Sequence, residues 1–140
     1  MIFVIDNSVV MRWFFGDGKA RDLSYANSVL DHLKVADAIV PCVWSLEVAN
    51  VISRAEAQGI VTEARSEAFL EMLAGIDIKT DSASIEHAMT STLNLARRYK
   101  LSSYDASYLE LASRQGVALA TLDTNLRKTA KKIGVKILLA

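Results

Sequence analysis

Four acidic residues stand where a carboxylate could do chemistry. Asp6 follows the apolar run of residues 1–5, and Asp123 comes soon after the apolar run of residues 117–121. Short apolar runs are typical of strands buried on both faces, and ligands of open α/β sheets bind just outside the carboxyl ends of such strands. We therefore expect Asp6 and Asp123 at one edge of a parallel sheet. The alternative for each is an ordinary N-cap of the helix that follows.

Glu47 and Asp105 lie near the beginnings of predicted helices that the sheet could bring to the same edge. On a helix, Glu47 has Val43, Trp44 and Val51 among its three- and four-residue neighbours, so most of its face is apolar. A lone buried carboxylate is costly unless it is paired or binds a metal ion. The alternatives are a Glu47 that reaches solvent at the rim, and an Asp105 stabilised by the dipole of its own helix.

The combination of these acids indicates a cation. Crowded carboxylates repel and raise each other's pKa values, which a fold tolerates when a cation neutralises them. Carboxylates without nitrogen or sulfur ligands favour Mg²⁺ or Mn²⁺. Mg²⁺ usually keeps several waters, one of which can become a nucleophile while the ion stabilises charge on a phosphate.

The composition predicts one domain over residues 1–140. Of the 140 residues, 51% are hydrophobic and 23% are charged, so a sizeable core is expected and wholesale disorder is not. Sixteen basic and sixteen acidic residues give a formal net charge of zero, so bulk charge does not indicate a nucleic-acid binder, although a local patch would suffice. The lone Cys42 is expected to be buried. The absence of a long apolar run and of a basic leader predicts a soluble, cytoplasmic protein with no membrane contact.

Strand and helix patterns alternate along the chain. Residues 1–5, 38–40, 76–79, 117–121 and 136–139 have strand patterns, and residues 8–15, 20–36, 43–58, 62–74, 82–99, 102–115 and 124–133 have helix patterns. In the range 82–99, Ile85 and Met89 belong to the expected apolar stripe. This alternation predicts an α/β fold in which a central, mainly parallel sheet of about five strands is covered by helices on both sides.

Four segments resemble the motifs of PIN-domain proteins, in order and in spacing, across nearly the whole chain. They are Asp6-Asn7-Ser8 after the first strand, the stretch from Pro41 to Asn50 with its acid at Glu47, the stretch from Leu101 to Leu109 with Asp105, and the stretch from Ala120 to Leu126 with Asp123. The length of the chain resembles that of VapC-type toxins of bacterial and archaeal toxin–antitoxin pairs.

The resemblance implies a PIN-like three-layer α/β/α sandwich and an endoribonuclease that depends on Mg²⁺ or Mn²⁺. Asp6, Glu47, Asp105 and Asp123 would be catalytic, holding the metal and positioning the attacking water. The polar support around them would come from Ser8, Thr121 and Asn125. Some relatives have another acid where this chain has Asn125, so the resemblance leaves a second metal site open. It also implies a homodimer and a small antitoxin partner.

Two further groups of residues each have more than one possible role. Basic residues flank the last two motifs and are either contacts to an RNA backbone or parts of solvated helix faces; they are Arg97, Arg98, Arg127 and Lys128. Three aromatic residues follow the first motif and belong to the core, to a dimer contact, or to a groove for an amphipathic antitoxin helix; they are Trp13, Phe14 and Phe15.

Two other functions compete with RNA cleavage. Asp6 could accept a phosphoryl group as an aspartyl phosphate, in a phosphatase or a receiver-like module. Ser8 then stands where such phosphatases have a second acid. The other alternative is a binding module that has the fold but no catalytic activity.

Overall fold

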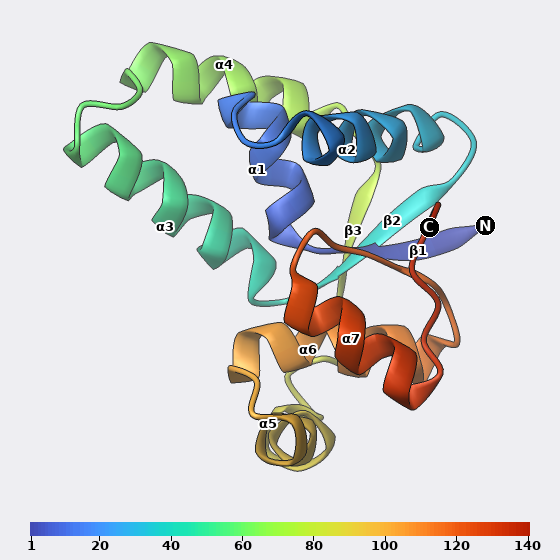
Figure 1. Cartoon of the computed structure of the whole chain (residues 1–140). Coiled ribbons are helices and arrows are strands. Elements are labelled where there is room, and N and C mark those ends of the chain that lie inside the picture. Colours follow the sequence, from blue (N-terminus) through green and yellow to red (C-terminus); the bar gives the residue numbers. More distant parts are fainter.

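Four parallel strands form the central sheet of the computed structural model, which describes residues 1–140 (Figure 1). The strands are β1 (Ile2–Ile5), β2 (Asp37–Pro41), β3 (Ile78–Asp81) and β4 (Leu119–Ala120), in the order β3-β2-β1-β4. Every neighbouring pair is parallel. All four carboxyl ends therefore lie at the same edge of the sheet.

Helices cover both faces of this sheet. They are α1 (Asn7–Phe15), α2 (Ala20–His32), α3 (Trp44–Ala57), α4 (Glu63–Ala74), α5 (Leu93–Tyr99), α6 (Ser103–Gln115) and α7 (Thr124–Ile133). In Figure 1, α1, α2, α3 and α4 lie on one side of the sheet, and α5, α6 and α7 lie on the other. The predicted three-layer α/β/α fold is thus confirmed. No helix combines the length and the apolar character that crossing a membrane requires.

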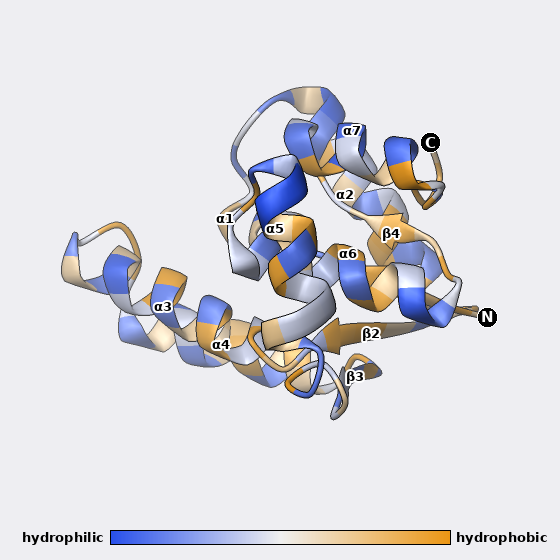
Figure 2. Cartoon of the chain, turned by 90° about the horizontal axis from the view of Figure 1, so that it is seen from below, coloured by the Kyte–Doolittle hydropathy of each residue, from blue (hydrophilic) through white to orange (hydrophobic).

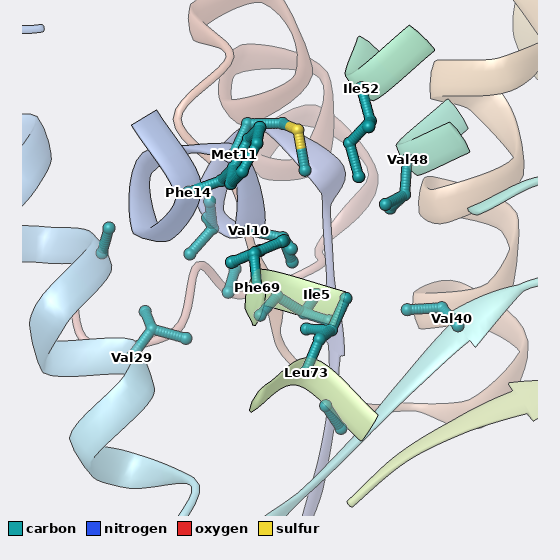
Figure 3. Packing of buried hydrophobic residues seen from close by; sticks show 14 of the residues in the cluster. Ile5, Val10, Met11, Phe14, Val29, Val40, Val48, Ile52, Phe69 and Leu73 are labelled. Carbon is teal, nitrogen blue, oxygen red and sulfur yellow. The ribbon is translucent and has the colours of Figure 1, made fainter. Parts of the chain in front are cut away.

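The side chains of β1 belong to two separate hydrophobic cores, one on each face of the sheet. Phe3 and Ile5 belong to a cluster that α1, α2, α3 and α4 complete, whereas Val4 between them belongs to a cluster with α6 and α7. Successive side chains of a strand point to opposite faces, so an unbroken apolar run serves both. Figure 3 shows Phe69 and Leu73 of α4 packed near Ile5 in the first cluster. In Figure 2, β2 and β4 are mostly hydrophobic, while the helices alternate between hydrophobic and hydrophilic residues.

The end of the chain does not form the predicted fifth strand. Over residues 136–139, only Ile137 makes a bridge, to Leu119 of β4. Leu138 N donates to Leu119 O at 2.9 Å, but Leu139 has φ of +56°, which an extended strand excludes. The sheet therefore has four strands and a single-residue extension, a small departure from the expected five.

The predicted helix over residues 82–99 is wrong in its first half. Residues 82–87 form turns, residues Ala88–Thr92 form a π-helical segment, and only then does α5 begin. Thr92 N donates to His87 O, five residues back, which shifts the phase of the helix. Ile85, in the turns, is 67% exposed and Met89, in the π-helical segment, is 85% exposed, although the sequence pattern predicts that they are buried.

Smaller differences concern the boundaries and Cys42. The helix expected over residues 20–36 ends at His32, because turns follow and Asp37 N must pair with Met1 O at 2.9 Å to begin β2. Cys42 is exposed, so the prediction that it is buried is wrong. It follows β2 directly, in a turn where its backbone N–H donates to Ser84 Oγ at 2.9 Å.

The three aromatic residues of the first helix all pack against the core. Phe14 is buried beside Phe69, with ring centroids 4.6 Å apart, and Trp13 and Phe15 are partly buried against the same cluster. Trp13 Nε1 also donates to Ala26 O of α2 at 2.8 Å. Because these side chains join α1 to its neighbours, the segment does not leave the open apolar groove that the sequence suggested.

Candidate active site at the carboxyl edge of the sheet

The pairing of β1 with β4 brings the first and last motifs together. Ile5 lies opposite Ala120, and Asp6 N donates to Ala120 O at 2.9 Å. The next side chain on each strand is therefore at the sheet edge: Asp6 on one and Thr121 on the other. Register alone thus joins residues that are 115 positions apart in the sequence.

Two hydroxyl groups hold the Asp6 carboxylate. Ser8 Oγ and Thr121 Oγ1 donate to Asp6 Oδ2 at 2.6 and 2.7 Å, and only 5% of Asp6 is exposed. Ser8 Oγ also accepts from Leu122 N at 3.0 Å, which ties the loop after β4 to the start of α1. Both hydroxyl groups, which the resemblance assigns to the polar support of the site, contact Asp6, and neither brings a positive charge to the carboxylate.

Asp123 is a helix cap and also a neighbour of the other acids. Its Oδ1 accepts from Leu126 N at 2.8 Å, so it is the N-cap of α7. Its backbone N–H donates to Thr121 Oγ1 at 3.1 Å. Its negative charge raises the pKa values of both Asp6 and Asp105. The capping role that the sequence offered as an alternative therefore coexists with a place in the acidic cluster.

Glu47, in the first turn of α3, has a partner that sequence reasoning missed. The hydroxyl of Tyr108 on α6 donates to Glu47 Oε1, and the Tyr108 side chain is fully buried. Burial and the nearby Glu47 raise the pKa of the Tyr108 phenol well above its usual range, so Tyr108 stays a donor. The only signal in the sequence was spacing, since Tyr108 lies three residues after Asp105 on one helix face.

Asp105 lies in the first turn of α6. Its backbone N–H donates to the N-cap Ser102 Oγ at 3.0 Å. Its half-buried carboxylate interacts with the other acids through charge. Burial, together with the charges of Asp6 and Asp123, raises its pKa to about 6. A carboxyl with such a pKa is often part of a functional site.

The four acids form one electrostatic group without a positive partner. Burial raises the pKa values of Asp6 and Glu47 as well, and the negative charges of Asp6 and Asp105 also raise the pKa of Glu47. None of the salt bridges of the chain involves any of these carboxylates. The group we call the acidic site comprises Asp6, Glu47, Asp105 and Asp123.

The donor set of the acidic site fits a hydrated divalent cation. All of its donor atoms are carboxylate oxygens, which suit Mg²⁺ or Mn²⁺. No group of three or more acidic, histidine or cysteine side chains is placed to hold a metal ion directly. Mg²⁺ takes one or two carboxylates directly and keeps several waters, so an open set of this kind meets its needs.

The other predicted residues lie at different distances from the acidic site. Asn125 is exposed in the first turn of α7 and makes no side-chain hydrogen bond. Arg127 Nε donates to Thr121 O at 2.7 Å, which brings its guanidinium beside the site. Lys128 is exposed on α7, and Arg97 and Arg98 are exposed near the end of α5.

Comparisons with known proteins agree with this fold. The profile of the PIN domain family matches residues 3–132. Three solved structures are similar: PAE2754 from Pyrobaculum aerophilum (20% identity, 92% of this chain and 87% of that chain, TM-score 0.65), VapBC2 from Rickettsia felis bound to a DNA fragment from their promoter (13%, 98% and 96%, 0.64), and FitAcB from Neisseria gonorrhoeae (14%, 98% and 96%, 0.56). No curated protein sequence matches the chain significantly. At such identities the structural likeness shows the fold alone.

Proposed function

The chain belongs to the PIN domain family, and from that premise we propose that it is an endoribonuclease that depends on Mg²⁺ or Mn²⁺. The observation that carries this proposal is the acidic site, in which the charges of four carboxylates meet at one sheet edge without any cationic side chain. Members of this family are generally nucleases that use divalent metal ions. The finer assignment to RNA, and to Mg²⁺ or Mn²⁺, rests on the motif resemblance and on the oxygen-only donor set.

Each residue of the site has a distinct part in this proposal. Asp6, Glu47, Asp105 and Asp123 are the groups that would hold the cation, directly or through water. When bound, the cation supplies Lewis acidity and lowers the pKa of water near the phosphate. Ser8 and Thr121 keep the Asp6 carboxylate in one orientation through its Oδ2 atom. Tyr108 does the same for Glu47, which is attached to a different helix.

The competing functions have no observation in their favour. An aspartyl phosphate at Asp6 would need a carboxylate open to an incoming phosphoryl group, but Asp6 is buried and its Oδ2 is occupied by two hydroxyls. A binding module without activity would not need four unneutralised carboxylates, which cost stability when no cation is present. RNA cleavage uses the same feature that these alternatives leave unexplained.

We also propose that the protein is the toxin of a VapBC-type toxin–antitoxin pair, that it forms a homodimer, and that a small antitoxin inhibits it. The motif resemblance to VapC-type toxins and the similarity in fold to VapBC2 support this pairing. The open groove at residues 13–15 is not part of this proposal, because these residues pack against the core. Co-expression with the neighbouring gene, followed by purification through a tag on this chain, tests the pairing. If no small protein co-purifies and RNase activity is the same with and without the neighbour, the pairing is wrong while the nuclease proposal stands.

A metal titration with two substrates tests the nuclease itself. The purified protein, stripped of metal by chelation, is incubated with single-stranded RNA and with DNA of the same sequence while Mg²⁺ or Mn²⁺ is added. We expect cleavage of RNA that rises with either ion and stops in excess chelator. Undiminished RNA cleavage in chelator would contradict the metal dependence, and cleavage of DNA alone would contradict the substrate.

A further inference from the structure

A basic hollow opens beside the acidic site, between the first turns of α2 and the start of α7. Its volume is about 410 Å³, and its lining includes three cationic side chains, Lys19, Arg21 and Arg127, against one carboxylate, Asp22. None of the three cations has a carboxylate partner within salt-bridge distance. In Figure 1 the loop that leads from β4 to α7 passes directly below α2. The hollow thus concentrates positive charge that the protein itself leaves unpaired.

Arg127 is held in place before any ligand arrives. Its Nε donates to Thr121 O at 2.7 Å, and its guanidinium carbon lies 4.6 Å from the centre of the Tyr25 ring. Tyr25 in turn is fixed, because its hydroxyl donates to Leu138 O at 2.8 Å. These contacts use the Nε atom and one face of the guanidinium, which also lies close enough to act on the Tyr25 hydroxyl through its charge and hydrogen bonding. A planar guanidinium oriented in this way is suited to bind a phosphate group with little loss of conformational entropy.

The hollow and the acidic site share a wall. Leu122 and Thr124 line the hollow, and Asp123 lies between them in the sequence. Thr121 connects the two regions directly, since its hydroxyl donates to Asp6 and its carbonyl accepts from Arg127. Arg127 is therefore linked to Asp6 through a single residue, yet none of the three cations forms an ion pair with a carboxylate of the acidic site.

We propose that this hollow binds a phosphodiester group of the substrate strand, close to the one that reaches the acidic site. The acidic site repels a polyanion, so a strand that crosses it gains from cations immediately beside it. Lys19, Arg21 and Arg127 supply these cations, and they fix which way the strand lies across the sheet edge. The identity of the strand rests on the proposed nuclease function, whereas the affinity for phosphate rests only on the hollow.

Binding measured without cleavage tests this site. A fluorescently labelled single-stranded RNA is titrated with the metal-free protein in chelator, over a series of KCl concentrations. Arg21→Gln and Lys19→Gln should each weaken binding by roughly three- to tenfold, and should reduce the slope of log affinity against log salt by about 0.7 per lost phosphate contact. The matched controls are Arg54→Gln, exposed on α3, and Lys79→Gln, exposed on β3 at the far edge of the sheet. Equal affinity and slope in the hollow variants and the controls would overturn the proposal.

Two further comparisons complete the test. One distinguishes free phosphate from an RNA strand as the ligand, and the other distinguishes a failure of this site from a failure of the nuclease proposal. Inorganic phosphate at constant ionic strength should displace the labelled RNA only at far higher concentration than unlabelled RNA does, and equal displacement would overturn a strand-binding site. If the protein cleaves no RNA but the hollow variants still weaken binding, the site stands and the nuclease proposal fails. If cleavage depends on metal but the hollow variants bind like the controls, the nuclease proposal stands and this site is wrong.

Discussion

Helix α6 connects two groups of carboxylates that differ in how their charge is balanced. At its start, Asp105 belongs to the acidic site, where the nearest charges are negative. Near its end, Arg114 forms ion pairs with Glu110 of the same helix and with Asp81, the last residue of β3. Asp81 and the acidic site share the carboxyl edge of the sheet, separated by the width of β2. We call the second group the ion-pair cluster.

The ion-pair cluster is complete without any ligand. Arg114 Nε donates to both oxygens of Glu110 at 2.9 and 3.1 Å, and Arg114 Nη2 donates to Asp81 Oδ2 at 2.6 Å. Glu110 is 4% exposed and Asp81 is 9% exposed, so these acids are as deeply buried as Asp6. Hydrogen bonds to both carboxylates raise the pKa of Arg114 above its already high value, which keeps it charged. Sequence reasoning missed this cluster.

The presence or absence of an arginine partner decides the role of a buried carboxylate in this fold. Where the protein supplies an arginine, buried acids bind parts of the chain to one another. Where it supplies only hydroxyl groups, as around Asp6, burial raises the carboxyl pKa and the ionised site carries an electrostatic cost. A bound cation would relieve that cost, so the acidic site is suited to a ligand and the ion-pair cluster to stability.

The largest expected effect is on activity. Asp6→Asn or Asp105→Asn should reduce RNA cleavage to below detection, by a factor of about 100 or more, since even the loss of outer partners of a metal site costs 10- to 100-fold. Apo stability should hold or rise, because each change removes one of the repelling charges. Asp77→Asn, an exposed position just before β3, is the matched control and should cleave normally. Metal-dependent cleavage at the wild-type rate in Asp6→Asn or Asp105→Asn would contradict the site assignment.

The ion-pair cluster should respond in the opposite sense. Arg114→Met leaves Glu110 and Asp81 buried without a partner, and should lower the free energy of unfolding by about 3–5 kcal/mol. Urea denaturation of the metal-free protein measures this loss. Arg97→Met, at an exposed arginine of α5 without an ion pair, should change stability by less than about 0.5 kcal/mol.

Removing the whole ion-pair cluster is a further check. The triple variant Asp81→Asn, Glu110→Gln, Arg114→Met should recover much of the stability that Arg114→Met loses, because no buried charge then remains. If the triple variant is instead as unstable as Arg114→Met alone, the cost comes from packing around residue 114 and not from unpaired carboxylates.

The third prediction concerns added metal. Mg²⁺ at about 100 times its dissociation constant should stabilise the wild-type protein by about 2.7 kcal/mol, if it binds only the folded state. Thermal unfolding with MgCl2, against NaCl of equal ionic strength, measures the shift. Asp105→Asn should lose most of this shift and Arg97→Met should keep it. A shift of equal size in Asp105→Asn would place the bound ion elsewhere.

The smallest expected effect is the dependence of apo stability on pH. The pKa of Asp105 rises from 3.8 to about 6 on folding, so between these values the folded state binds more protons than the unfolded state. The contribution of Asp105 to stability is therefore greatest below about pH 4 and falls as pH rises to about 6. Half exposure of the side chain keeps the effect modest. The comparison is urea denaturation of wild type and Asp105→Asn in chelator at both ends of this range; parallel curves would contradict the raised pKa.

Local patterns in the sequence predicted much of the fold and the identity of the acidic residues. The run before Asp6 is apolar at every position, as a strand buried on both faces requires, and α7 begins at an acid that could be recognised as its cap. Failures occurred where local patterns were ambiguous. The stripe of Ile85 and Met89 assumed a regular helix, whereas residues 82–87 form turns and residues 88–92 form a π-helical segment. Cys42 was judged by residue type, but the turn after β2 exposes it.

The sequence by itself determined which residues carry charge, where the first strand ends and which helices have an acid in or just before their first turn, because these depend on neighbours a few positions away. Only the tertiary structure decided how each charge is balanced. Glu47 lies 61 positions from the hydroxyl of Tyr108, and Asp81 lies 33 positions from Arg114. Such partners meet through strand order and helix packing, which no local spacing encodes. The physical reason is that a carboxylate's pKa and its role depend on the charges and donors around it in space, and the fold alone brings those together.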